Sequence, residues 1–479
     1  MGALCLSWPP RRACQQDKHK APTQPLHHPL SLRNRGPFPT QPTRVKVMET
    51  ILKKEAPASE AGLITSTLRK IIVCALITLV GFNLRSVILG VPPILPLIQQ
   101  DLGLSYAATG LLTALPVLAL AGGSWPSGLL TERIGARLCV SIGLVLLAAG
   151  ALLRALWPTE FSLFLFTLLL SLGITLSQTA VPVLIRHWFP KQIGFVAALF
   201  TDGLIIGEAV AAGLTVPVML RFMGSDAWAS TFIFWGVPVL VLFAFWLWLA
   251  PPAHTRVPTR PFSPERNTVT TSQSSAPPTQ RTRVSALHLG ILVGGGSLVY
   301  FGMNAWIASY NQAMHQSNLT PLSLLILNAA QLPASLGVTL IAQQIAGRRW
   351  PFVTAGIICA FAIAGWIFTP ATLQYLWAAL LGGSAALVFT LGTALPPLLA
   401  SPQEVGRLTG ITFSLTYAVA FVGPFIGGVL WDLFHLPAMA FVPVAAASVI
   451  LIVLGALLPS RASFGIPGKT RHIGTPPTI

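Results

Sequence analysis

The sequence predicts an all-α membrane protein with twelve transmembrane helices arranged in two six-helix halves. Hydrophobic residues make up 53% of the chain and charged residues only 9%, whereas a soluble domain carries about 25% charged residues. Apolar segments of about 20 residues, the length that crosses a bilayer as a helix, recur from residue 71 almost to the end of the chain. One long polar segment separates the first six of these segments from the last six.

The twelve expected spans follow one another with mostly short connections. They are placed at residues 71–98, 106–130, 138–157, 161–185, 194–220, 229–250, 286–311, 320–346, 351–369, 373–397, 406–431 and 438–458. The exception among the connections is residues 251–285, which are rich in Pro, Ser, Thr and Arg and predict a flexible cytoplasmic linker. This linker divides the membrane region into an N-terminal half, residues 70–250, and a C-terminal half, residues 286–459.

The N-terminal residues 1–69 contain no apolar run long enough to span a bilayer. Residues 1–47 hold eight Lys or Arg against one acid, Asp17, together with eight prolines, and this composition predicts a disordered basic tail. Contact of this tail with anionic lipid is an alternative. Another is that translation naturally starts at Met48, in which case residues 1–47 come from an over-extended gene start. Residues 460–479 are expected to form a cytoplasmic tail.

The placement of basic residues predicts the orientation of the spans. With the N-terminus in the cytoplasm, the outer side holds only Arg154 and Arg221, and the inner side holds Arg133, Arg137, Arg186, Lys191, Arg256, Arg260, Arg266, Arg281, Arg283, Arg348, Arg349 and Arg407. This asymmetry predicts a multi-pass protein of the cell inner membrane with both termini in the cytoplasm. It also explains most of the basic balance of the membrane region without a nucleic-acid partner.

The cysteines and histidines indicate neither a metal site nor a catalytic centre. Cys74, Cys139 and Cys359 lie in or beside apolar spans without the spacing of metal ligands. All nine histidines fall in tails, loops or span ends, and none is grouped with acids as catalysis requires. We therefore expect no cofactor, no metal and no enzymatic activity.

The two halves resemble each other at a nearly constant offset, which predicts a duplication. Residues 113–116 match 330–333, residues 179–182 match 393–396, and the pair Gly203 and Gly207 matches Gly423 and Gly427. Two parallel halves around a site near the bilayer midplane are typical of carriers that work by alternating access.

The loop after the second span carries a more specific motif. Its residues 128–137 read GLLTERIGAR and resemble the signature loop of the major facilitator superfamily, with Glu132 in place of the usual Asp and Ala136 in place of a basic residue. The resemblance implies a latch, an ion pair of this acid with arginines that holds the inner gate closed. The alternative is a solvated loop whose arginines only set topology. The gating residues are Gly128, Glu132, Arg133, Gly135 and Arg137, and in the second copy Gly347, Arg348 and Arg349.

Further segments resemble the cyanate permease and 2-nitroimidazole transporter family within that superfamily. They are GFNLRSVILGVPPILPLI from Gly81, TGLLTALPVLALAG from Thr109, GALLRALWP from Gly150, VPVLIRHWFP from Val181, GSLVYFGMNAWIASY from Gly296 and VGPFIGGVLWD from Val422. The resemblance covers roughly residues 70–458. It implies a twelve-helix carrier, in the major facilitator fold, that moves small solutes by rocking one half against the other.

Arg85 is the first candidate for substrate binding. It lies about 21 Å deep in the first span, where a cation costs at least about 2.5–3.5 kcal/mol. A role in holding an anionic or polar substrate, together with the nearby Asn83, would compensate this cost. The alternatives are that Arg85 reaches the outer interface or serves packing within the first half.

Two acids in the fifth span, Asp202 and Glu208, are candidates for proton coupling. Glu208 lies at about the same depth as Arg85, and the matching position of the second half is Gly428, so the fold does not require an acid there. One interpretation is a permanent Arg85–Glu208 pair. The other is a protonatable carboxylate that couples transport to the proton gradient.

Uncharged polar side chains complete the candidate substrate site. They are Gln178, Tyr300, Asn304, Trp306, Asn328 and Gln331. Such groups suit a cavity for a small polar solute. Hydrogen bonding between helices is the alternative for the amides, and interfacial packing is the alternative for Trp306.

These observations favour a secondary carrier of a small polar or anionic, cyanate-like solute. The alternative is proton-driven efflux of drug-like or nitroheterocyclic compounds, and a sensor that binds without transporting is a further class. The expected partners are a small-molecule substrate, the lipid bilayer and protons as the candidate coupling ion, and we expect a monomer.

Overall fold

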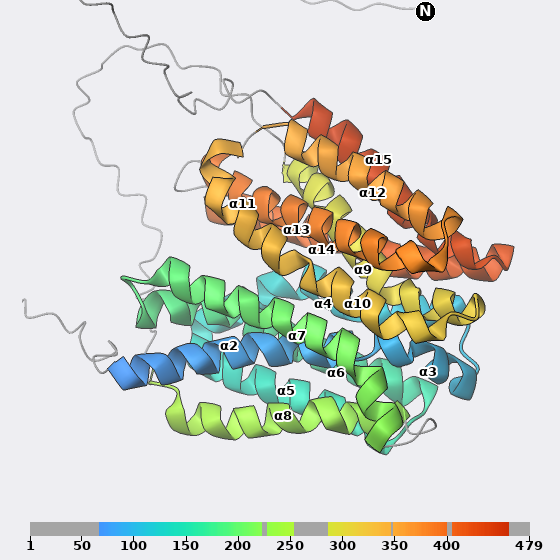
Figure 1. The fold of residues 1–479 in the computed structure, drawn as a ribbon. Coiled ribbons are helices and arrows are strands. Elements are labelled where there is room, and N and C mark those ends of the chain that lie inside the picture. Colours follow the sequence, from blue (N-terminus) through green and yellow to red (C-terminus); the bar gives the residue numbers. More distant parts are fainter. Residues whose placement is uncertain (1–66, 223–227, 253–285, 346–347, 400–404, 459–479) are drawn as a thin grey trace, which may run out of the picture. The chain divides into compact units, whose positions relative to one another are not determined.

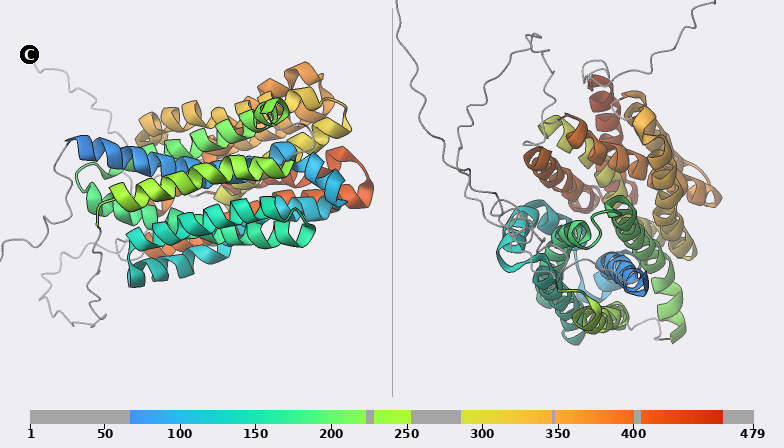
Figure 2. Two further views of the ribbon diagram at one scale, coloured as in Figure 1. Left: turned by 90° about the horizontal axis from the view of Figure 1, so that it is seen from below. Right: turned by 90° about the vertical axis from the view of Figure 1, so that its left-hand side faces the viewer.

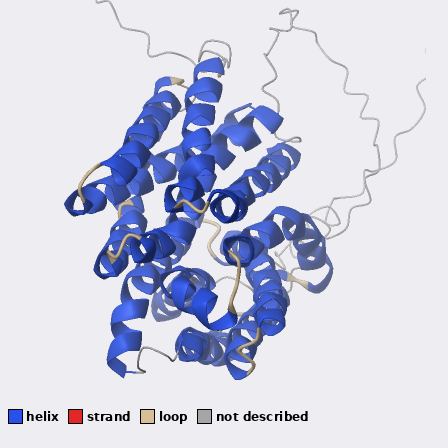
Figure 3. Cartoon of the chain, turned by 90° about the vertical axis from the view of Figure 1, so that its right-hand side faces the viewer, coloured by secondary structure: helices blue, strands red, loops and turns tan. Residues whose placement is uncertain are grey.

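The computed structural model describes residues 67–222, 228–252, 286–345, 348–399 and 405–458. These residues form α-helices, short 3₁₀ helices and connecting turns (Figure 3). Within these ranges, twelve helical segments are long and apolar enough to cross a membrane, which confirms the predicted fold class. Residues 1–66 of the expected N-terminal tail, the expected C-terminal tail, nearly all of the linker 251–285, and Gly347 lie outside the described residues. Residues 67–69, expected in the N-terminal tail, belong instead to the first helix.

The first six spans are coloured blue to green in Figure 1. Their elements are α2 (Thr67–Leu89), η2 (Pro92–Ile94), α3 (Leu95–Leu102), α4 (Tyr106–Ile134), α5 (Ala136–Leu156), α6 (Glu160–Trp188), α7 (Ile193–Phe222) and α8 (Trp228–Leu249). The most extensive packing within this group joins α2 to α7, and α6 to both α5 and α4.

The last six spans are coloured yellow to red. Their elements are α9 (Ala286–Ala313), η3 (Ser317–Leu319), α10 (Thr320–Ala329), α11 (Gln331–Ile345), α12 (Trp350–Phe368), η4 (Ala371–Leu373), α13 (Gln374–Leu399), α14 (Val405–Phe434), η5 (Pro437–Phe441) and α15 (Val442–Leu457). The most extensive contacts between this group and the first six spans are those of α4 with α14 and of α7 with α10. The views along and across the helices show both groups (Figure 2).

The first span is not the continuous helix expected over residues 71–98. Helix α2 ends at Leu89, and the chain continues through η2 into α3. Pro92, Pro93 and Pro96 cause this break, because proline lacks the N–H that a helix interior needs and clashes with the preceding turn.

The eighth span, expected as one helix over residues 320–346, is also divided. Helix α10 ends at Ala329 and α11 begins at Gln331. Pro333 has no N–H to donate to the carbonyl of Ala329, so the regular bond across the break is lost. Its counterpart in the internal repeat, Pro116, lies inside the continuous helix α4.

The two ends of the bundle differ in charge. We define the basic end as the end where α4 and α6 finish and α5 and α7 begin, with Arg133, Arg137, Arg186 and Lys191. The chain turns there from α4 into α5 through Gly135, whose φ of 90° suits glycine. The opposite end is where α2 finishes and α4 begins.

Helices α4 and α14 touch at the opposite end and separate toward the basic end. A Cβ added to Gly110 would lie 2.3 Å from the carbonyl oxygen of Pro424, and one added to Gly428 would lie 2.2 Å from that of Tyr106. Near the basic end, a Cβ on Gly128 or Gly410 would meet nothing within 4 Å. The bundle is therefore closed between these helices at one end and spread apart at the other.

Candidate functional site

The described residues contain one ion pair, Arg85 with Glu208, and it lies in the middle of the bundle. Arg85 Nε is 3.3 Å from Glu208 Oε1, and both side chains are less than a tenth exposed. Glycines bring the two helices together, because a Cβ on Gly203 or Gly207 would lie within 2.3 Å of a backbone oxygen of α2. The sequence thus builds a close α2–α7 contact that allows the two charges to meet.

Three further side chains surround this pair. Gln331 Nε2 donates a hydrogen bond to Glu208 Oε2 at 3.1 Å, and the ring of Phe301 lies 5.9 Å from Arg85 Cζ. The pair, Gln331 and Phe301 line a small cavity of about 100 Å³, and Tyr417 belongs to the same wall. Arg85 Nε faces Glu208 as an ion pair but makes no hydrogen bond of good geometry.

A larger cavity of about 1180 Å³ connects Arg85 with the basic end. Its wall runs from Arg85 and Tyr417 through Gln178 to Gly128 and the exposed Glu132 in the last turns of α4. Arg85 and Tyr417 line both cavities, so the ion pair lies at the inner end of the passage. The cavity therefore extends between the basic end and this pair.

Closure of the opposite end centres on Asp432, in the last turn of α14. Its carboxylate accepts hydrogen bonds from the backbone N–H groups of Tyr106, at 2.9 Å, and Ala107, at 2.7 Å. Both N–H groups lie in the first turn of α4 and therefore have no acceptor within the helix. The helix dipole also favours a negative charge at this position. Tyr106 stacks on Trp431 with ring centroids 4.1 Å apart. We call this arrangement the Asp432 closure.

The predicted polar residues divide between the cavities and the helix contacts. Gln178 lines the large cavity and donates to the Tyr417 hydroxyl at 3.3 Å, and Tyr300 lines the small one. The fully buried Asn328 accepts from the Tyr300 hydroxyl at 2.6 Å and donates to Asn304 Oδ1 at 2.9 Å. For Asn304 and Asn328, the alternative of hydrogen bonding between helices therefore holds.

Three other candidates lie away from the two cavities. Asn83 donates to the carbonyl of Leu79 on its own helix at 2.9 Å. Trp306 is fully buried and packs near Trp431, with ring centroids 5.7 Å apart, so it belongs to the Asp432 closure. Asp202 is partly exposed, and no ion pair reaches it from any described residue.

The expected latch is not formed within the described ranges. Glu132 is exposed and no described arginine lies within ion-pair distance of it. Arg137 donates to the carbonyl of Leu247 in the last turn of α8 at 3.1 Å, and Arg349 donates to the carbonyl of Leu458. Arg133 and Arg348 are exposed. The separation of α4 from α14 at the basic end accounts for the unpaired acid.

Sequence reasoning did not find the Asp432 closure. The sequence places Asp432 at the outer end of the eleventh span but does not show which helix start it meets. Two sequence features mark the residues that meet there. One is the Trp–Asp pair at the end of the eleventh span, and the other is the Ser105–Tyr106 start of the second span.

Replacing Asp432 by alanine is expected to open the opposite end more often. Loss of two hydrogen bonds to a charged group, each worth about 1.5–3 kcal/mol, should raise labelling of a Thr109→Cys reporter by an impermeant maleimide at least about tenfold. The measurement uses a background without native cysteines.

Asp101→Asn is the matched control for this experiment. Asp101 accepts a hydrogen bond from Trp228 Nε1 at 2.9 Å, but both residues belong to the first six spans. It should leave the labelling rate unchanged. Equal labelling of the Asp432 variant and the unmodified reporter would show that these bonds do not hold the end closed.

Comparison with known proteins gives the same architecture. The model of the Major Facilitator Superfamily matches residues 71–381. The crystal structure of a bacterial homolog of the human lysosomal transporter Spinster superposes with a TM-score of 0.63 at 14% identity, covering 82% of this chain and 97% of that one.

Three bacterial transporters are similar over most of the chain. The Escherichia coli cyanate transport protein CynX is 28% identical over 366 residues, 74% of this chain and 88% of its own. The E. coli 2-nitroimidazole transporter is 27% identical over 390 residues, 81% of this chain and 95% of its own. The Bacillus subtilis uncharacterized transporter YycB is 27% identical over 383 residues, 79% of this chain and 90% of its own. With twelve spans, a cavity ending at a buried ion pair and a family model across both groups of helices, the chain belongs to the Major Facilitator Superfamily of membrane transporters.

Proposed function

We propose that this transporter is a secondary carrier of a small monovalent anion such as cyanate, which binds at Arg85. The observation that carries this proposal is a buried guanidinium at the inner end of a cavity that reaches the basic end. Arg85 and Glu208 are the only charged side chains among the residues lining the small cavity. The similarity to a cyanate transport protein supports the same substrate class.

Glu208 gives this site a means of coupling to protons. The site is neutral when Arg85 pairs with ionised Glu208. It is neutral again when Glu208 is protonated and an anion takes its place beside Arg85. Because a net charge in a medium of low dielectric constant costs several kcal/mol, the neutral states are the ones that can change conformation easily. Movement of the anion alone, or of the proton alone, is disfavoured.

The carrier then works by alternating access across the Asp432 closure. In the described conformation the passage leads from Arg85 to the basic end, while α4 and α14 meet at the other end. Release of Asp432 from the start of α4 and approach of these helices at the basic end would expose Arg85 to the other side. The pairing of Glu132 with arginines then belongs to that second conformation.

The basic end is proposed to face the cytoplasm of the cell inner membrane, as the excess of Lys and Arg there favours. Both termini are then cytoplasmic. The chain is proposed to act as a monomer, with residues 70–250 and 286–459 as its two moving halves joined by the linker 251–285.

Efflux of a flat heterocycle is the second candidate function. Phe389, Phe413 and Tyr417 line the large cavity, with adjacent ring centroids 6.2 and 6.3 Å apart. Aromatic faces of this kind suit stacking with a heterocyclic ring. The similarity to a 2-nitroimidazole transporter supports this candidate.

Counterflow in proteoliposomes distinguishes these functions. Vesicles loaded with unlabelled cyanate should take up labelled cyanate rapidly, and a 2-nitroimidazole load should not drive this exchange. Protein-free vesicles and vesicles that hold the protein but lack internal cyanate are the controls. Exchange of the nitroimidazole without exchange of cyanate would overturn the anion proposal in favour of efflux.

A further inference from the structure

A second arginine, Arg154, is buried without an acidic partner. It lies in the last turn of α5, is 2% exposed, and no described acid lies within ion-pair distance of it. Its partners are the Thr167 hydroxyl, 3.4 Å from Nη1, and the ring of Phe232, 4.1 Å from Cζ. Nε and Nη2 have no hydrogen-bond partner. Buried cations are normally paired, so this charge lacks a compensating group.

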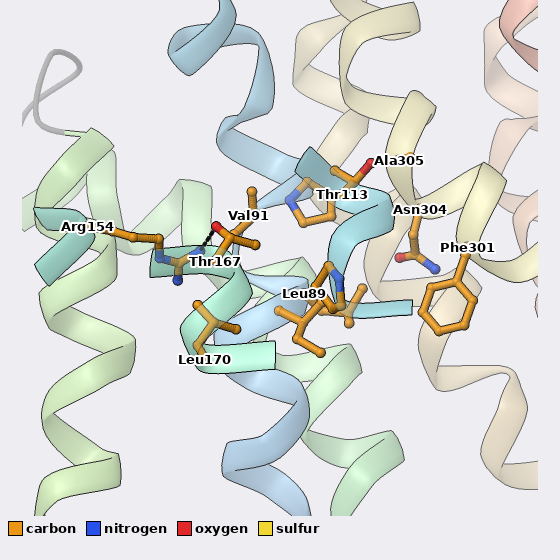
Figure 4. A pocket seen from close by; sticks show the side chains of 12 residues that line it. Leu89, Val91, Thr113, Arg154, Thr167, Leu170, Phe301, Asn304 and Ala305 are labelled. Atoms are coloured by element: carbon orange, nitrogen blue, oxygen red, sulfur yellow. Dashed lines mark hydrogen bonds between the residues drawn. The ribbon is translucent and has the colours of Figure 1, made fainter. Parts of the chain in front are cut away.

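The side chain points into a separate small cavity. Figure 4 shows the guanidinium directed from α5 toward Thr167 and Val91. Thr113 and Asn304 add a hydroxyl and an amide to the wall, and the remaining wall is mostly apolar. The cavity volume is about 20 Å³, enough for a single small ion or water.

This cavity lies beyond the Arg85 site, toward the opposite end. Phe301 lines both the Arg154 cavity and the small cavity at Arg85. Asn304, one turn further along α9, lines the Arg154 cavity. The Arg154 cavity is also lined by Leu89 and Pro92, where the first span is broken. The two arginines are therefore separated by the ring of Phe301 and belong to different cavities.

Neither contact of Arg154 explains an apolar, closed environment for a permanent cation. A guanidinium carries five N–H donors, and one weak hydrogen bond uses only one of them. The side chain does not reach the surface, although its helix ends nearby, so water at an interface does not solvate it. A partner that fills this gap is small and accepts hydrogen bonds, and a negative charge on it would also compensate the guanidinium.

We propose that the Arg154 cavity is a binding site for a small monovalent anion, of chloride size in the described conformation. Arg154 Nε and Nη2 donate to the anion. Thr113 only lines the wall beside it, because its hydroxyl donates to the carbonyl of Gly110 at 2.9 Å. The site is distinct from the proposed substrate site. It does not depend on what is carried at Arg85, because its lining shares only Phe301 with that cavity.

Chloride binding to the purified full-length protein tests this site. The double variant Arg85→Gln with Glu208→Gln removes both charges of the central site and serves as the background. Equilibrium dialysis with ³⁶Cl⁻ should show one bound chloride per chain in this background. Adding Arg154→Gln should weaken binding at least about tenfold, the loss of one charge-assisted hydrogen bond. Arg154→Lys, which keeps the charge, should retain part of the affinity.

A structural measurement on the wild-type protein tests the proposal even if the Arg154→Gln variant does not fold. Bromide replaces chloride in crystals of the wild-type protein, and its anomalous signal should appear beside Arg154. Sodium gluconate, whose anion is too large for the cavity, is the matched control salt. Water alone in the cavity, together with chloride binding that Arg154→Gln leaves unchanged, would overturn the proposal.

Discussion

Replacing Arg85 by glutamine is expected to lower cyanate counterflow at least about 100-fold. The guanidinium is the only cation in the small cavity, and its hydrogen bonds to an anion are worth about 1.5–3 kcal/mol each. Glutamine keeps much of the length of the side chain but not its charge. Initial rates of labelled cyanate exchange in proteoliposomes measure the effect.

Stability must be separated from transport in this experiment. Removing Arg85 leaves Glu208 buried without its partner, which costs about 3–5 kcal/mol if the carboxylate stays ionised. The double variant Arg85→Gln with Glu208→Gln removes both charges and should recover most of the thermal stability without recovering exchange. Arg186→Ala, an exposed arginine at the basic end, is the control. Normal exchange in the double variant would exclude Arg85 from substrate binding.

Replacing Glu208 by glutamine should separate exchange from accumulation. Glutamine resembles the protonated acid, so Arg85 remains available and counterflow should continue at a rate within about threefold of wild type. Uptake driven by an imposed pH gradient should lose nearly all of its concentrating ability, because no proton can bind at this position. The ratio of internal to external cyanate, with and without the gradient, measures the effect.

Asp202→Asn is the matched control, since Asp202 lies on the same helix without an ion pair among the described residues. It should accumulate cyanate as wild type does. Gradient-driven accumulation by the Glu208→Gln variant would assign Glu208 to a permanent structural pair with Arg85.

The sequence predicts the spans and the position of the Arg85–Glu208 pair, because both depend on how deep each residue lies in the bilayer. Hydropathy locates each span, and counting residues along a helix places Arg85 and Glu208 at the same level of the bilayer. The breaks after Leu89 and Ala329 also have a local cause in Pro92, Pro93 and Pro333, although the expected spans did not take it into account.

What sequence leaves undetermined is the direction in which each side chain leaves its helix. Asn304 and Asn328 resemble cavity residues by type, yet they bond to each other between α9 and α10. The direction of its side chain likewise decides that Trp306 packs in the Asp432 closure. Asp432 meets a helix start that is distant in the chain, and Arg154 is enclosed by the neighbouring α6 and the more distant α8. These contacts also depend on the conformation that the carrier occupies.

The division of the eighth span at Ala330 gives the carrier a joint in the second group of helices. Helix α10 is held against α7, where a Cβ on Gly213 would lie 2.8 Å from the Leu325 side chain. Helix α11 has little contact with α7, and a Cβ on Gly337 would meet nothing within 4 Å. Helix α11 instead packs against α13, so the basic end can narrow if α11 bends at this joint together with α13. Gln331 lies next to the joint and donates a hydrogen bond to Glu208. Loss of the carboxylate charge on protonation would weaken that contact and so favour the bend.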